Sequence, residues 1–153
     1  MAEHESATIT WTDVVSHLTV ARSYWLNTVN ADFSPHAAPV WGIAYEDDFY
    51  FYTSRETIKA RNLARDPRVI VHLESAENVL IVHGRAKDCG EPRSSPDVVA
   101  SLDAKYDDPG DAEYLPSNNE AFDVLFRIAP SKALTWVLND YDASQRRWRE
   151  GFS

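Results

Sequence analysis

Residues 49–71 constrain the fold of this chain more than any other stretch. They begin with alternating aromatic residues, a pattern typical of a half-buried strand, and continue into a turn rich in hydroxyl groups. A short basic helix is predicted over residues 58–66, and Pro67 ends it before another strand begins at Arg68. The pattern therefore predicts strand, turn, helix and strand in close succession.

The turn and the first turn of this helix form a candidate phosphate site. Helix N-termini present free N–H groups and the positive end of the helix dipole. The hydroxyl groups of Thr53 and Thr57 and the ammonium group of Lys59 would add directed donors. A plainer interpretation makes Thr57 only the N-cap and the basic residues only a solvated helix face, and capping is the commoner of the two roles.

Short strands separated by turn signals are expected in most of the chain. The expected strands cover residues 23–30, 36–45, 49–53, 68–73, 79–87, 124–129 and 132–138, and further helices cover residues 10–18 and 98–106. Pro39 and Gly42 predict a bulge, or a close approach to the backbone, inside the second strand. The pattern indicates a mainly β fold with peripheral helices, a closed or nearly closed barrel, forming one domain over residues 1–153.

Composition narrows the range of partners and compartments. The net charge is -9 and the pI is about 4.9, so nucleic acid and anionic membranes are not expected to bind. The single cysteine, Cys89, allows no intrachain disulfide, which fits a reducing cytoplasm. The first residues do not resemble a secretory signal and no apolar run is long enough for a membrane span, so we expect a cytoplasmic protein.

The histidines and the cysteine do not predict a metal site or a nucleophile. His72 and His83 could face each other across a hairpin, but a third ligand is not evident nearby. Cys89 stands beside Gly90 at a strand end, without a neighbouring base. We therefore expect neither a metal site nor a catalytic side chain.

A series of short motifs carries a resemblance to a known family. The motifs are Pro35-His36-Ala37-Ala38-Pro39-Val40-Trp41, Phe51-Tyr52-Thr53, Lys59-Ala60-Arg61-Asn62-Leu63, Asp66-Pro67-Arg68-Val69, Val82-His83-Gly84-Arg85, Pro130-Ser131-Lys132-Ala133 and Arg147-Trp148-Arg149. In this order and spacing, residues 11–149 resemble the pyridoxamine 5'-phosphate oxidase-like family of flavin-binding split barrels.

The resemblance implies a six-stranded antiparallel split β-barrel that forms a homodimer, with two cofactor sites at the subunit interface. FMN is the usual cofactor, the 8-hydroxy-5-deazaflavin coenzyme is the alternative, and haem is the weakest candidate. By position, the implied cofactor-binding residues along the ring are Pro39, Val40, Trp41 and Gly42, and those at the phosphate are Thr53, Ser54, Arg55, Thr57 and Lys59. The implied set also includes Asn78, Val79, Trp136, Arg147 and Trp148. Of these, Trp136, Arg147 and Trp148 match the segment that reaches the partner's cofactor.

Two departures from the family pattern narrow the implied function. Ile58 stands where family oxidases often carry an arginine beside the phosphate lysine, and after Trp136 the C-terminal Arg-x-His that grips the substrate phosphate is missing. Oxidation of vitamin B6 is therefore not expected. The resemblance favours a flavin- or deazaflavin-dependent oxidoreductase that transfers hydride with a small conjugated or heteroaromatic substrate. The alternatives are a non-catalytic cofactor-binding, carrier or sensor protein, and a barrel whose cofactor site has decayed.

Overall fold

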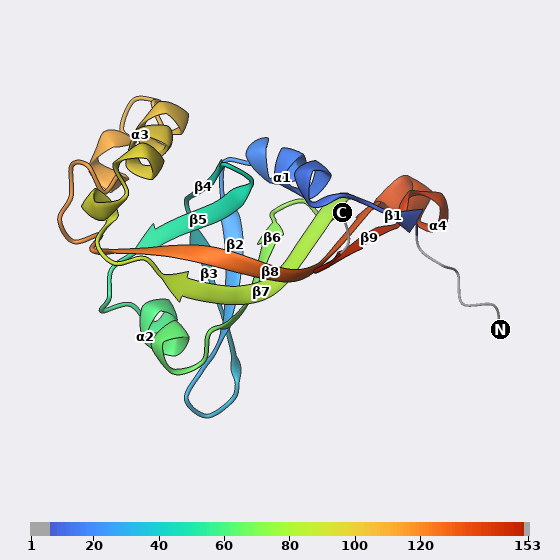
Figure 1. Cartoon of the computed structure of the whole chain (residues 1–153), viewed down its shortest axis with the longest axis horizontal. Helices are drawn as coiled ribbons and strands as arrows, with labels where there is room; N and C mark the ends of the chain where they lie inside the picture. Colours follow the sequence, from blue (N-terminus) through green and yellow to red (C-terminus); the bar gives the residue numbers. More distant parts are fainter. Residues whose placement is uncertain (1–6, 152–153) are drawn as a thin grey trace.

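The computed structural model describes residues 7–151 as a mixed nine-stranded sheet with four α-helices around it (Figure 1). The strands are β1 (Ala7–Thr8), β2 (Tyr24–Val29), β3 (Pro35–Val40), β4 (Gly42–Tyr45), β5 (Asp48–Thr53), β6 (Arg68–Leu73), β7 (Asn78–Asp88), β8 (Val124–Val137) and β9 (Arg146–Arg149). The α-helices are α1 (Trp11–Thr19), α2 (Ile58–Arg65), α3 (Pro96–Lys105) and α4 (Tyr141–Ser144). The expected mainly β fold with peripheral helices is confirmed, whereas the six-stranded barrel and the homodimer stay predictions.

The long strand β8 joins the parts of the sheet. It pairs with β7 along most of its length, while its first half also pairs with β5 and its second half with β9. Beyond β7 the order continues through β6 and β2 to β3. After β3 the chain turns at Trp41 and returns as β4, which pairs with β5. Residues 35–45 therefore pair with β2 before Trp41 and with β5 after it, at two separate places in the sheet.

The strand expected over residues 36–45 is two strands. At Trp41 the chain leaves its partner β2 and takes β5 as its new partner. A Cβ atom on Gly42 would lie 2.6 Å from both Phe49 Cζ and the Tyr50 carbonyl oxygen. The close approach that the glycine predicted is thus made by β5 of the same chain.

The two strands expected over residues 124–129 and 132–138 are one strand, β8. Its register against β7 shifts between His83 and Gly84, so Pro130 and Ser131 lie at an irregularity instead of a turn. Proline is tolerated at such a position because a β-bulge leaves ladder hydrogen bonds unmade. A Cβ atom on Gly84 would lie 2.5 Å from the Ala129 carbonyl oxygen, which explains why the partner strand can approach there.

The basic segment near the C-terminus is also part of the sheet. Arg146–Arg149 form β9, which pairs antiparallel with β8 and parallel with β1. The short strand β1 and the helix α4 were not expected from the sequence. Within residues 7–151, no helix combines the length and the apolar character needed to cross a membrane.

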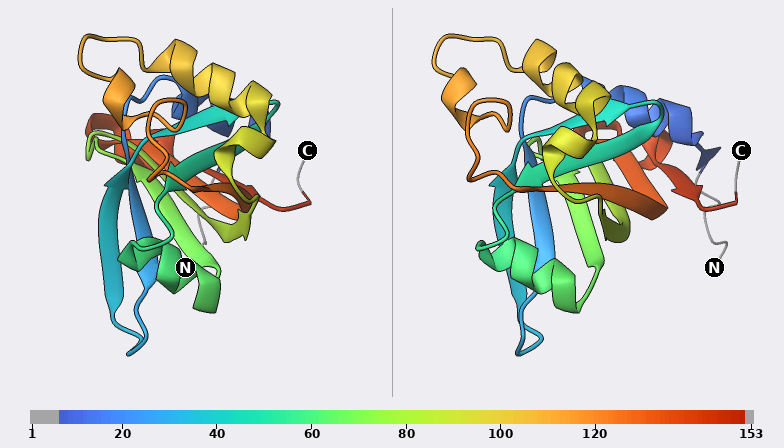
Figure 2. Two further views of the ribbon diagram at one scale, coloured as in Figure 1. Left: turned by 90° about the vertical axis from the view of Figure 1, so that its left-hand side faces the viewer. Right: turned by 60° about the vertical axis from the view of Figure 1, so that its left-hand side comes forward.

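Two apolar clusters hold the fold together. The larger one lies inside the sheet beneath α1 and α2, and includes Leu18, Leu26, Phe49 and Val124. The smaller one joins α3 and the loop after it to β5 and β8. In Figure 2, α3 lies at the opposite end of the molecule from the turn between β2 and β3. The site described next lies between these two ends, where β3 gives way to β4.

Candidate functional site

A cleft of about 350 Å³ lies where β3, the end of β5 and the first turn of α2 meet. It is lined by Ser23, Pro39, Val40, Trp41, Tyr52, Thr53, Lys59, Tyr114 and Phe122. The structure thus brings together three of the four predicted ring-side residues, Pro39, Val40 and Trp41, and two of the predicted phosphate-side residues, Thr53 and Lys59. We refer to this space as the Lys59 cleft.

The Thr53 hydroxyl, which lines the cleft, belongs to a short hydrogen-bonded chain that leads to Thr57. The Thr53 and Thr57 hydroxyl oxygens lie 3.2 Å apart. The Thr57 hydroxyl accepts from the Ala60 N–H and donates to the Ser54 carbonyl, so its predicted role as N-cap is confirmed. The N–H groups of Ile58 and Lys59 precede the first intrahelical hydrogen bond, which leaves them available to an acceptor.

Lys59 is a cation in an unfavourable position. Its side chain is half-buried, and burial lowers the pKa of its ammonium group. It also sits in the first turn of α2, where the helix dipole disfavours positive charge. Among the described residues, none of the ion pairs involves Lys59. An anionic group in the cleft would relieve both penalties.

Ser54, Arg55 and Thr57, also predicted at the phosphate, do not line the cleft, and neither does Gly42, predicted along the ring. The Arg55 guanidinium donates two hydrogen bonds, of 2.7 and 3.1 Å, to the Asp88 carboxylate. These bonds lower the pKa of Asp88. The backbone N–H of Arg55 donates to the Asp123 carboxylate. The charge of Arg55 is therefore engaged within the chain.

Trp41 is fixed by residues that follow far along the chain. Its ring stacks on Tyr106, and the Arg22 guanidinium lies 5.0 Å from its centroid. The Tyr106 hydroxyl accepts from the Gly42 N–H at 3.0 Å and donates to the Arg22 carbonyl at 2.6 Å. The end of α3 therefore holds the turn between β3 and β4.

Three aromatic residues that line the cleft, Tyr52, Tyr114 and Phe122, were not predicted from the sequence. The Tyr52 hydroxyl donates to the Tyr114 carbonyl at 2.5 Å, and the rings of Tyr52 and Phe122 meet edge to face at 5.2 Å. Tyr114 and Phe122 come from the loop between α3 and β8. The only signal in the sequence was the presence of these aromatic residues in an otherwise polar loop.

The remaining predicted residues lie elsewhere on the chain. Asn78 pairs with Val137 and Val79 with Trp136 across β7 and β8, and Arg147 lies on β9. Asn78 lines a separate hollow, and none of this group lines the Lys59 cleft. A single chain therefore does not bring the two predicted groups together.

Trp148, the last predicted residue, belongs to the core of its own chain. Its side chain is only 5% exposed, and its ring centroid lies 4.9 Å from that of Trp11. Packing against Trp11 gives this tryptophan a structural role that its sequence neighbours did not reveal.

The two strand histidines do not face each other as the sequence suggested. His72 lies opposite Ile81 and His83 opposite Ile70, which places the histidines diagonally across β6 and β7. No cluster of three or more metal-ligating side chains occurs in the part of the chain that the structure describes.

Comparison with known proteins identifies the family. A family model described as pyridoxamine 5'-phosphate oxidase matches residues 13–141, and the chain belongs to this family. A structure of a conserved hypothetical protein from Mycobacterium tuberculosis is 22% identical, with a TM-score of 0.66 over 97% of this chain and 90% of that chain. No curated protein matches the sequence.

Two further structures show how widely the fold is used. A protein described as an F420 reductase is 22% identical, with a TM-score of 0.61 over 77% of this chain and 94% of that chain. The haem storage protein HutZ from Vibrio cholerae is 17% identical, with a TM-score of 0.61 over 78% of this chain and 87% of that chain. At these identities the likeness shows a shared fold, and fold alone does not define function.

Proposed function

We propose that the Lys59 cleft binds FMN or the 8-hydroxy-5-deazaflavin coenzyme by its phosphate, and that the protein is an oxidoreductase for a small conjugated or heteroaromatic substrate. The observation that carries this proposal is the half-buried ammonium group of Lys59 at a helix N-terminus, which has no ion-pair partner within residues 7–151. Family membership and the fold shared with an F420 reductase support it.

The residues of the cleft suit such a ligand. Lys59, the Thr53 hydroxyl and the N–H groups of the first turn of α2 would hold the phosphate. Val40 and Trp41 would contact a planar ring, and the aromatic loop residues would exclude water from it. The bound cofactor would supply the hydride chemistry itself, and the protein its position and surroundings.

We propose that the site is completed in a homodimer. The second group of predicted residues, Asn78, Val79, Trp136 and Arg147, lies outside the cleft of its own chain. In a two-fold dimer, surfaces that are apart within one chain can meet across the axis, so the partner would supply this second group.

The experiment compares Lys59→Ala with Lys59→Arg. FMN and the deazaflavin coenzyme are titrated into each folded variant while cofactor fluorescence is followed, and circular dichroism checks the fold. Loss of a charge-assisted hydrogen bond should weaken binding by roughly tenfold to a hundredfold in Lys59→Ala, with partial retention in Lys59→Arg. Unchanged affinity in a folded Lys59→Ala protein would refute the proposal.

A non-catalytic cofactor carrier is the second candidate function. It is supported by the fold that the chain shares with the haem storage protein HutZ. Because a bound cofactor carries out hydride transfer without a catalytic side chain, the lining of the cleft fits either function. The two functions are distinguished by mixing the protein, loaded with reduced cofactor, with conjugated acceptors and measuring the rate of cofactor oxidation. On a carrier, the bound cofactor would be oxidised no faster than the free reduced cofactor.

A further inference from the structure

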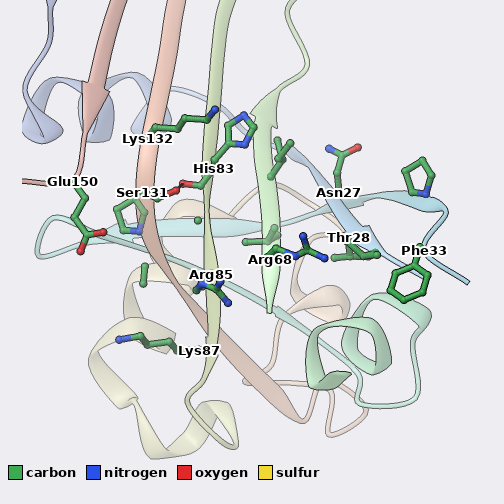
Figure 3. A pocket seen from close by; sticks show the side chains of 17 residues that line it. Asn27, Thr28, Phe33, Arg68, His83, Arg85, Lys87, Ser131, Lys132 and Glu150 are labelled. Carbon is green, nitrogen blue, oxygen red and sulfur yellow. Dashed lines mark hydrogen bonds between the residues drawn. The ribbon is translucent and has the colours of Figure 1, made fainter. Parts of the chain in front are cut away.

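A second, larger hollow lies on the outer face of the sheet, over β2, β6, β7 and β8 (Figure 3). Its volume is about 770 Å³, and it shares no lining residue with the Lys59 cleft. The charged and imidazole side chains that line it are Arg68, His83, Arg85, Lys87, Lys132 and Glu150. We refer to it as the basic groove.

The positive charge of the basic groove is mostly uncompensated. Of the described ion pairs, none involves Arg85, Lys87 or Lys132. Arg68 is paired with Asp66 at 2.6 Å, and this pairing lowers the pKa of the Asp66 carboxyl to about 2. In a chain with a net charge of -9, acidic side chains are plentiful, yet within residues 7–151 Glu150 is the only carboxylate that lines the groove.

Two cations also oppose each other in the sheet. Arg68 lies directly opposite Arg85, and like charges at directly opposite positions destabilise a sheet. The Asp66 carboxylate, which pairs with Arg68 and also interacts with Arg85, offsets part of this repulsion. His83 lies directly opposite Lys132, and burial and the nearby Lys132 lower the pKa of His83, which favours its neutral form. A bound anion would relieve the remaining repulsion.

A buried donor without an acceptor adds to the same surface. The amide nitrogen of Asn27, on β2, is buried and has no hydrogen-bond partner among residues 7–151. Asn27 lines the basic groove. This nitrogen is shielded from solvent, so a ligand in the groove would accept from it only after the side chain turns outward, and the cost of an unsatisfied buried donor would favour that turn.

The spacing of the basic and imidazole side chains indicates the shape of the ligand. His83, Arg85 and Lys87 occupy alternate positions on β7, so successive members are separated by roughly 7 Å along the strand. One isolated phosphate would contact only part of such a row. A chain of linked anionic groups would span it.

We propose that the basic groove binds a small linear polyanion that carries several phosphate or carboxylate groups, at a site separate from the Lys59 cleft. The occupant is a small molecule and not nucleic acid, because the overall negative charge of the protein repels a long polyanionic backbone.

Isothermal titration calorimetry tests the proposal with two probes, inorganic tripolyphosphate and propane-1,2,3-tricarboxylate. We expect saturable binding of at least one probe, weakened by added salt because salt screens exposed charges. The probe that binds more tightly shows whether the groove prefers phosphate or carboxylate groups. The Arg85→Gln, Lys87→Gln double variant should bind the probe at least about tenfold more weakly.

Two further variants serve as controls. Arg93→Gln removes a cation that is 85% exposed and lies outside the groove, and it should bind as the unmodified protein does. Lys59→Ala should also bind the polyanion probe as the unmodified protein does. A failure of cofactor binding in this variant can then be told apart from a failure of the basic groove. Sedimentation of each variant reports its oligomeric state.

Four outcomes would overturn the proposal, three of them in the binding measurements. These three are no saturable binding of either probe, unchanged binding in the double variant, and loss of binding in Lys59→Ala alone. Conversion of a dimer to monomers by Arg85→Gln, Lys87→Gln would assign the groove to a subunit interface and would equally overturn it.

Discussion

The indole ring of Trp41 stacks face to face on the phenol ring of Tyr106, with centroids 4.2 Å apart and planes 2° from parallel. Trp41 is the residue at which the chain passes from β3 to β4, and Tyr106 directly follows α3. The pair therefore connects the wall of the Lys59 cleft to a helix outside the sheet. Disturbing α3 should disturb the cleft.

Tyr106→Phe should destabilise the protein without removing the ring stack. The substitution leaves the Gly42 N–H without its acceptor, which should lower the free energy of unfolding by about 1–3 kcal/mol. Urea unfolding measures the loss, and near-UV circular dichroism should still show an ordered Trp41. The exposed Tyr141→Phe substitution is the control and should stay within about 0.5 kcal/mol. Equal stability of the two variants would contradict the assigned role.

Lys105 should make stability depend on pH in the alkaline range. Its ammonium group donates to the Tyr24 hydroxyl at 2.8 Å and the Gly42 carbonyl at 2.9 Å, while burial and the nearby Arg22 lower its pKa to about 8. Between pH 8 and about 10 the folded chain has lost this proton and the unfolded chain still holds it, so the free energy of unfolding should rise with pH.

Comparison with Lys105→Met isolates this effect. Relative to that variant, the unmodified protein should gain about 1–3 kcal/mol between pH 7 and 10. Burial raises the pKa of Tyr106 to about 12, and this tyrosine has the opposite effect on stability only above about pH 10. Parallel pH profiles for the two proteins would show that Lys105 is not the titrating group.

Gly42→Ala should destabilise the pairing of β4 with β5. The added methyl group would meet Phe49 Cζ and the Tyr50 carbonyl oxygen, each at 2.6 Å, and a backbone carbonyl in a paired strand cannot easily move away. Overpacking of this kind should lower the free energy of unfolding by about 1–3 kcal/mol, which thermal or urea unfolding measures. Undiminished stability would show that β5 shifts to accept the methyl group.

Several features were predictable because they depend on neighbours in the sequence. The capping box of Thr10 and Asp13 and the N-cap Thr57 form hydrogen bonds that reach only three residues. The alternation in β2, with Tyr24 and Leu26 facing the core, follows from the two-residue period of a strand. Short motifs in a fixed order were likewise sufficient to identify the family.

What only the tertiary structure decided depends on contacts between distant residues. The hydroxyl contact from Tyr106 to Gly42 joins residues 64 positions apart, and the chain changes its partner strand at Trp41. No local pattern encodes either feature. Trp148 looked like a site residue in sequence and is buried against Trp11. Periodicity and capping are set by the backbone within a few residues, whereas the cleft and the basic groove exist only once several strands and helices have packed together.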